Sequence, residues 1–189
     1  AGCDLVEIGI PFSDPIAEGP VIQKANIRAL KNNVTTDDVF QMVDEIKNDV
    51  DIPMVFMTYL NVLFKYGYDR FLTRAKEVGI CGVIIPDLPY EEKGELQSVA
   101  KNYGIEVVSL IAPTSEERIK MIAADAEGFV YAVSSLGVTG VRNEIKTDLE
   151  SITAAVKEAT DIPVAIGFGI STPEQAKKYA AVSDGVIVG

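Results

Sequence analysis

The chain contains no histidine, and only two of its 189 residues are cysteine. The missing histidine excludes Ser-His-Asp and Cys-His nucleophile schemes and every histidine-ligated metal site. Acid–base chemistry must therefore come from Asp, Glu, Tyr, Lys or Cys. Cys3 and Cys81 each lie in an apolar stretch of sequence. We expect both to be reduced thiols in the core of a cytoplasmic protein.

Basic residues are also scarce, with 17 Lys and Arg against 28 Asp and Glu, and the formal net charge is −11. This charge argues against a nucleic acid or an anionic membrane as partner, because either would require a basic face. An acidic chain can still bind a phosphate through backbone N–H groups and helix ends. No apolar run approaches the length of a membrane span.

Strands and helices alternate along the whole sequence. We expect short, β-branched strands at 3–10, 53–59, 82–87, 105–111, 128–134, 163–167 and 184–188. We expect helices near 23–31, 36–49, 68–78, 91–103, 115–125, 148–160 and 173–181. Two helix starts are marked by the runs TTDD at 35–38 and STPE at 171–174, and Gly79 and Gly104 mark helix ends.

This alternation predicts a parallel sheet, which could be an open doubly wound sheet or a closed barrel. We expect the α/β architecture of a (β/α)8 TIM barrel, in which each of eight strands is followed by a helix. The sequence contains seven strand candidates rather than eight. It begins at what looks like the second strand of such a barrel, and it ends on Gly189. We therefore expect residues 1–189 to be a single, partial TIM-barrel domain that lacks the first strand and the last helix.

Glu7 is the first candidate for chemistry. Side chains alternate along a strand, so Glu7 faces away from Ile8 and Ile10 and toward the barrel interior. A lone carboxylate in an apolar interior is costly, and its pKa rises toward the range that suits a proton shuttle. The alternative is a structural Glu paired with an Arg or Lys.

Other acidic residues follow the strands. Asp14 and Glu18 lie between prolines and glycine in the loop PFSDPIAEGPVIQ, where they could be held for function or could be solvated. Asp87 ends the strand GVIIPD, as a helix N-cap, a turn residue or an active-site residue. Tyr59 and Asn61 end another strand and Tyr131 lies within one. Each could be an ordinary core or rim residue, or the aromatic rings could line a pocket for a flat apolar ligand.

Glycine-bearing stretches, SLGVTG, IGFGIST and VIVG, follow the last three strands. Glycines at such positions let backbone N–H groups approach an anion, and the loops after the late strands are the recurrent phosphate site of this barrel class. The alternative is that these glycines only turn the chain.

Taken together, EIGIPFSDP, GPVIQ, MTYLN, PDLPYEE, SSLGVTG and GFGIST resemble, in order, the tryptophan synthase alpha subunit family. The resemblance implies that Glu7 is the catalytic glutamate. It also implies that Glu18 occupies the place of the catalytic aspartate, because this chain reads AEGP where the family reads ADGP. The carboxylate of Glu18 is then one methylene further from the backbone, which can misplace a catalytic group.

Further site residues are implied by the same resemblance. The substrate-binding residues would be Tyr59, Asp87, Tyr131, Thr139 and Phe168, and the phosphate-binding residues Gly140, Gly167, Gly169 and Gly189. Asp14 would contact the partner, the pyridoxal-phosphate beta subunit, in an alpha2-beta2 complex.

The implied reaction is the cleavage of indole-3-glycerol phosphate to indole and glyceraldehyde 3-phosphate in L-tryptophan biosynthesis, without a cofactor or metal. Two alternatives stay open from the sequence. The chain could be a catalytically weak regulatory subunit that activates the beta subunit, or another phosphate-binding barrel enzyme of indole or ribose phosphate metabolism.

Overall fold

The structure, a computed structural model, describes residues 2–133, 149–167 and 169–189. The chain forms two compact units. Unit 1 comprises Ala1–Ile16 and Val21–Val107, and unit 2 comprises Ala17–Pro20 and Val108–Gly189.

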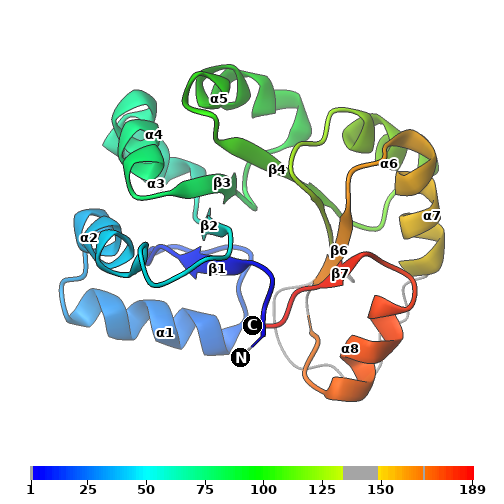
Figure 1. The fold of residues 1–189 in the computed structure, drawn as a ribbon, viewed down its shortest axis with the longest axis horizontal. Helices are drawn as coiled ribbons and strands as arrows, with labels where there is room; N and C mark the ends of the chain where they lie inside the picture. The colour runs from blue at the N-terminus through cyan, green and yellow to red at the C-terminus, as the bar shows by residue number, and fades with distance from the viewer. Residues whose placement is uncertain (1, 134–148, 168) are drawn as a thin grey trace. The chain divides into compact units, whose positions relative to one another are not determined.

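Unit 1 is built on three parallel strands that pair in chain order: β1 (Val6–Gly9), β2 (Met54–Met57) and β3 (Ile80–Ile84). Its helices are α1 (Pro20–Lys31), α2 (Thr36–Ile46), α3 (Leu60–Tyr66), α4 (Tyr68–Glu77) and α5 (Lys93–Ala100), with 3-10 turns η1 (Tyr90–Glu92) and η2 (Lys101–Tyr103). In Figure 1 these helices lie along one side of the three strands.

Unit 2 repeats this arrangement with four parallel strands in chain order: β4 (Glu106–Ile111), β5 (Val130–Val133), β6 (Val164–Gly167) and β7 (Gly185–Val186). The first residues of β4 belong to unit 1. The helices of unit 2 are α6 (Glu116–Ala124), α7 (Leu149–Ala159) and α8 (Pro173–Ala180). All seven predicted strands are therefore present, and all pairs described within the units are parallel.

The core of unit 1 lies on one face of its sheet. Ile10, Phe56 and Val83 point from the strands into a cluster that includes Phe40 of α2 and Phe71 of α4. The Phe40 ring packs edge-on against Phe56 and Phe71, with centroid distances of 5.4 and 5.1 Å. An open doubly wound sheet reverses its strand order and carries helices on both faces. The strands of unit 1 pair in chain order and carry their helices on one face of the sheet, which favours the barrel.

The predicted helix boundaries are confirmed where a cap marks them. Thr35 caps α2 by accepting a hydrogen bond from the backbone N–H of Asp38, which returns its carboxylate to the Thr35 N–H in a capping box. Thr172 begins α8 in the same way. Gly79 and Gly104 have φ values of +84° and +69°, a conformation that favours glycine at the end of a helix.

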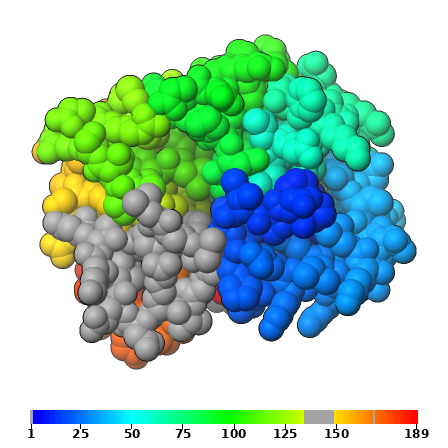
Figure 2. All heavy atoms as spheres, turned by 180° about the vertical axis from the view of Figure 1, so that it is seen from behind, coloured from blue at the N-terminus to red at the C-terminus, as the bar shows by residue number. Residues whose placement is uncertain are grey.

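Two predictions about single regions were wrong. The strand expected at 53–59 ends at Met57, and α3 follows it, so Asn61 lies inside a helix that was not predicted. Cys3 and Cys81 are free thiols but are exposed rather than in the core. Figure 2 shows the dark-blue start of the chain at the surface of the molecule. The Cys81 thiol donates a hydrogen bond to Met54 O at the amino end of β3.

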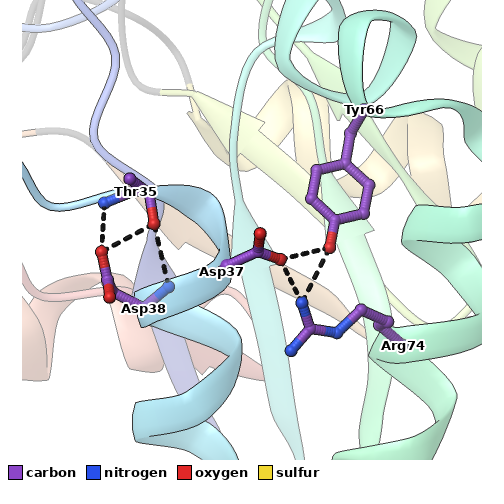
Figure 3. A network of polar contacts seen from close by, with 5 residues as sticks. All are labelled: Thr35, Asp37, Asp38, Tyr66 and Arg74. Atoms are coloured by element: carbon purple, nitrogen blue, oxygen red, sulfur yellow. Dashed lines mark hydrogen bonds and ion pairs between the residues drawn. The ribbon is translucent and has the colours of Figure 1, made fainter.

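A polar cluster joins three helices of unit 1 (Figure 3). The Tyr66 hydroxyl of α3 donates to Asp37 Oδ1 of α2 at 2.5 Å, and Arg74 of α4 pairs with the same carboxylate. Arg74 Nη1 also donates to the Tyr66 hydroxyl at 2.8 Å, and its guanidinium lies 4.7 Å from the Phe40 ring centroid. These contacts hold α2, α3 and α4 together above the apolar core.

Within the described residues, every helix is too short or too polar to span a lipid bilayer.

Candidate active site

Polar and aromatic residues gather at the carboxyl ends of the strands of unit 1. Tyr59 follows β2 and Asp87 follows β3, and Glu7 is the second of the four residues of β1. Parallel strands end at the same edge of a sheet, and this edge is where active sites of parallel α/β folds lie. Tyr59 and Asp87 therefore lie at one edge of unit 1, and Glu7 lies on β1 two residues before that edge.

Glu7 occupies the face opposite to the helix-packed core. Its neighbour across the sheet is Val55, which is 2% exposed, and Val55 in turn pairs with Gly82. Burial among such groups raises the Glu7 pKa from 4.5 to about 7. Glu7 Oε1 is buried and has no hydrogen-bond partner among the described residues. The predicted rise of the Glu7 pKa by burial is present in the structure, with Oε1 as the shielded oxygen.

A carboxyl group in this state can do proton chemistry in both directions. With a pKa of about 7, the protonated and ionised forms of Glu7 coexist near neutral pH. No described Lys or Arg forms an ion pair with Glu7. The alternative of a structural ion pair is therefore not supported.

The loop after β1 carries Phe12, Ser13 and Asp14. Ser13 Oγ donates to Asp14 Oδ2 at 2.5 Å, and both residues are exposed. The ring of Phe12 instead turns toward the protein, where it stacks on Tyr59 with a centroid distance of 5.0 Å and an interplanar angle of 26°. Phe12 was not singled out from the sequence, although an aromatic residue three positions after a strand end could have suggested it.

Tyr59 and Asp87 are connected through the start of α3. Tyr59 is 2% exposed and precedes the first helical residue, Leu60, without capping it through its own side chain. Asp87 Oδ1 accepts a hydrogen bond from Leu60 N at 2.9 Å. Asp87 is therefore a helix cap, as one interpretation of the sequence allowed, but it caps α3 rather than the helix that follows it.

Unit 2 contains Glu18 and Tyr131. Glu18 is half-buried in the short segment before α1, and its Oε2 atom is shielded from solvent. Tyr131 lies in β5 and is 5% exposed. Its ring packs on Gly167 of β6 so closely that a Cβ atom at Gly167 would lie 2.5 Å from both Tyr131 Cε1 and the Tyr131 hydroxyl. Gly167 is thus required for this contact, whatever its relation to an anion.

The remaining glycine positions are less informative. Gly169 has a φ of +80°, which favours glycine, and Gly189 is exposed. Thr139, Gly140 and Phe168 lie outside the described residues.

Comparison with known proteins gives one consistent result. A family model described as "Tryptophan synthase alpha chain" matches residues 1–189. The tryptophan synthase alpha chain of Lacticaseibacillus casei is 52% identical over 188 residues, covering 100% of this chain and 71% of that protein. The alpha chain of Thermoanaerobacter sp. (strain X514) is 52% identical over 189 residues, covering 100% and 72%.

Solved structures agree with the sequence comparison. Tryptophan synthase subunit alpha from Campylobacter jejuni superposes with a TM-score of 0.87 at 36% identity, covering 98% of this chain and 75% of that one. A structure of Mycobacterium tuberculosis tryptophan synthase gives a TM-score of 0.90 at 36% identity, covering 100% and 72%. These matches confirm the predicted TIM-barrel class, and they do not favour a different phosphate-binding barrel enzyme. From motif order, strand order and these likenesses together, the chain belongs to the tryptophan synthase alpha chain family.

Proposed function

We propose that this chain, as a lyase of tryptophan biosynthesis, cleaves indole-3-glycerol phosphate to indole and glyceraldehyde 3-phosphate with Glu7 as the acid–base residue. The observation that carries the proposal is the half-buried Glu7 of a parallel sheet, whose Oε1 is shielded from solvent without a hydrogen-bond partner among the described residues and whose pKa is raised to about 7. Family membership supplies the reaction, and the environment of Glu7 supplies the group that performs it.

The chemistry follows from the poor leaving ability of indole. Protonated Glu7 donates its proton to indole C3, which converts the ring to an indolenine. The Glu7 carboxylate then accepts the proton of the side-chain hydroxyl as the carbon–carbon bond breaks. The bonding electrons return to the ring, indole leaves, and the hydroxyl carbon becomes the aldehyde of glyceraldehyde 3-phosphate. Glu7 ends the cycle protonated, so one residue acts as acid and as base.

Glu18 stands in the place of the family's catalytic aspartate. Its carboxylate would favour the positive charge that develops at the indole N–H when C3 is protonated. The additional methylene of Glu18 changes where this carboxylate can reach, so Glu18→Asp tests whether its placement limits the rate.

The resemblance of the motifs to the family guides the proposal for substrate binding. We place the indole ring against aromatic and polar residues, and the phosphate at backbone N–H groups of glycine loops, whose remote binding energy orients the reacting carbon. The resemblance implies a substrate set of Tyr59, Asp87, Tyr131, Thr139 and Phe168, and a phosphate set of Gly140, Gly167, Gly169 and Gly189.

The partner of this chain is the tryptophan synthase beta subunit, a pyridoxal-phosphate enzyme, and we propose an alpha2-beta2 assembly. The exposed loop with Ser13 and Asp14 is the proposed contact, because its acidic group reaches solvent. We further propose a cytoplasmic location, which the two free thiols, Cys3 and Cys81, are consistent with. The match of one family model to residues 1–189 supports a single domain.

A steady-state assay on indole-3-glycerol phosphate, with and without beta subunit, tests the proposal. Glu7→Gln removes the titrating group but keeps its shape, and it should lower kcat by about 10³-fold or more while KM changes little. Glu18→Asp should retain or raise turnover. Cleavage by Glu7→Gln at near the parent rate would refute the role of Glu7, and a parent chain that activates the beta subunit without cleaving substrate would refute the lyase activity.

A further inference from the structure

Asp87 has a structural feature that family membership does not explain. Its carboxylate is half-buried and accepts the backbone N–H of Leu60, a residue 27 positions earlier in the chain. The first N–H groups of a helix need such an acceptor, and the residue that should provide it locally is Tyr59. Tyrosine is a poor N-cap residue, and Tyr59 makes no capping bond. Asp87 therefore supplies the cap of α3 from another strand end.

The capped turn holds Tyr59 in a defined place. Tyr59 directly precedes Leu60, has extended backbone angles of φ −104° and ψ 148°, and is 2% exposed. On its N-terminal side, Thr58 N donates to Ile84 O at 3.0 Å. Tyr59 is thus fixed on one side by a bond to β3 and on the other by the bond from Leu60 to Asp87.

The ring of Tyr59 connects the capped turn to the loop that follows β1, the strand of Glu7. It stacks on Phe12, and Phe12 lies in the loop that continues β1, the strand of Glu7. Beside this loop, Ile10 N donates to Met57 O at 2.9 Å, which extends the pairing of β1 and β2. The ends of β1, β2 and β3 are therefore joined in one chain of contacts, which runs through Phe12, Tyr59 and Asp87.

We propose that Asp87 is a positioning residue for the cleavage reaction, and that it acts through the Leu60 N–H to hold Tyr59 where the aromatic ring meets the substrate. This role rests on the proposed function of the site, but it differs from the direct substrate contact that the motif resemblance implies. Direct contact would depend on the negative charge of Asp87, whereas a cap depends only on a well-placed acceptor oxygen.

Two variants of Asp87 distinguish a helix cap from a direct substrate contact. Asp87→Asn keeps the shape and an acceptor oxygen but removes the charge, so it should lose several-fold less kcat/KM than Asp87→Ala. Asp87→Ala removes the acceptor and should lower kcat/KM by about tenfold or more, with both kcat and KM affected, because a displaced ring misplaces the substrate. An equal loss in both variants overturns the proposal, and so does no loss in Asp87→Ala.

A double-mutant cycle tests whether Asp87 acts through Tyr59. In a Tyr59→Ala background there is no ring left to position, so adding Asp87→Ala should change kcat/KM by less than about threefold. A full tenfold loss in that background would mean that Asp87 acts on the substrate independently of Tyr59, and the proposal would fail.

Thr35→Ala is the matched control. It removes the cap of α2, a helix start that carries none of the proposed site residues, so it should lower stability in the same way but leave kcat and KM unchanged. A comparable kinetic loss in Thr35→Ala would show that general destabilisation explains the Asp87 result.

Amide hydrogen exchange of residues 60–64 gives a readout that needs no turnover. Exchange there should speed up in Asp87→Ala and stay near the parent rate in Asp87→Asn. Unchanged exchange in Asp87→Ala would refute the cap, whereas failure of the parent chain to cleave substrate would refute the proposed function and leave the exchange result standing. If Asp87→Ala does not fold, Asp87→Ser replaces it, because its hydroxyl is too close to the backbone to reach Leu60.

Discussion

The variant Glu7→Gln should be more stable than the parent protein at neutral pH, and this difference in stability should grow as the pH rises. Burial raises the Glu7 pKa from 4.5 to about 7 in the folded state. Between these two pH values the unfolded chain has released the Glu7 proton while the folded chain still binds it. The stability of the parent protein therefore falls as pH rises through this window, because the folded state binds the additional proton.

The magnitude follows from the two pKa values. The difference between 4.5 and about 7, at about 1.36 kcal/mol for each pH unit, corresponds to about 3 kcal/mol. Glu7→Gln cannot ionise, so this loss is absent in the variant. The free energy of unfolding of Glu7→Gln minus that of the parent should rise by about 3 kcal/mol between pH 4.5 and pH 7.5, and it should be constant on either side.

The assay is urea unfolding followed by far-UV circular dichroism at half-unit pH steps, with both proteins in the same buffers. Other titrating groups are common to both proteins, so their contributions cancel in the difference. Glu174→Gln, which removes an exposed carboxyl from the first turn of α8, is the control and should give a much smaller change. A difference that stays flat with pH, or that falls as pH rises, would show that Glu7 is solvated or paired and would refute the reasoning.

Two further variants test packing and the helix cluster. Gly167→Ala forces a Cβ atom within 2.5 Å of the Tyr131 ring and should lower stability by about 1–3 kcal/mol in thermal unfolding. In the control Gly185→Ala the new Cβ would lie 3.6 Å from its nearest neighbour, so the loss of stability should be less than about 1 kcal/mol. Equal effects in the two variants would contradict the predicted clash. Arg74→Met removes the ion pair with the half-exposed Asp37 and should cost about 1 kcal/mol in urea unfolding, so a loss above about 3 kcal/mol would mean that the cluster is far stronger than exposed pairs.

Much of the fold could be predicted because its signals are local in sequence. Strand and helix alternation, and caps such as Thr35 and Thr172, depend on residues within a few positions of one another. The side of β1 on which Glu7 lies also follows from simple alternation, and the packing of Ile8 and Ile10 with the helices confirms it.

The features that the sequence did not reveal depend on contacts between distant residues. Helix α3 has only seven residues and begins after a tyrosine, so no local cap announces it. Its cap is Asp87, which becomes adjacent only when β2 and β3 pair. Gly167 likewise looked like an anion-binding glycine, and its contact with the Tyr131 ring exists only because β5 and β6 are neighbours.

Glu7 differs from these cases because it stands out in the sequence as a residue that does not suit a buried strand. A carboxylate among β-branched residues opposes every local preference of a buried strand, and near neutral pH it costs about 3 kcal/mol that Gln at the same position would avoid. Proteins keep such a group where activity requires it, since stabilising substitutions are otherwise easy to find. The cost that makes Glu7 visible in the sequence therefore has the same physical origin as its proposed catalytic use: desolvation keeps its proton available near neutral pH.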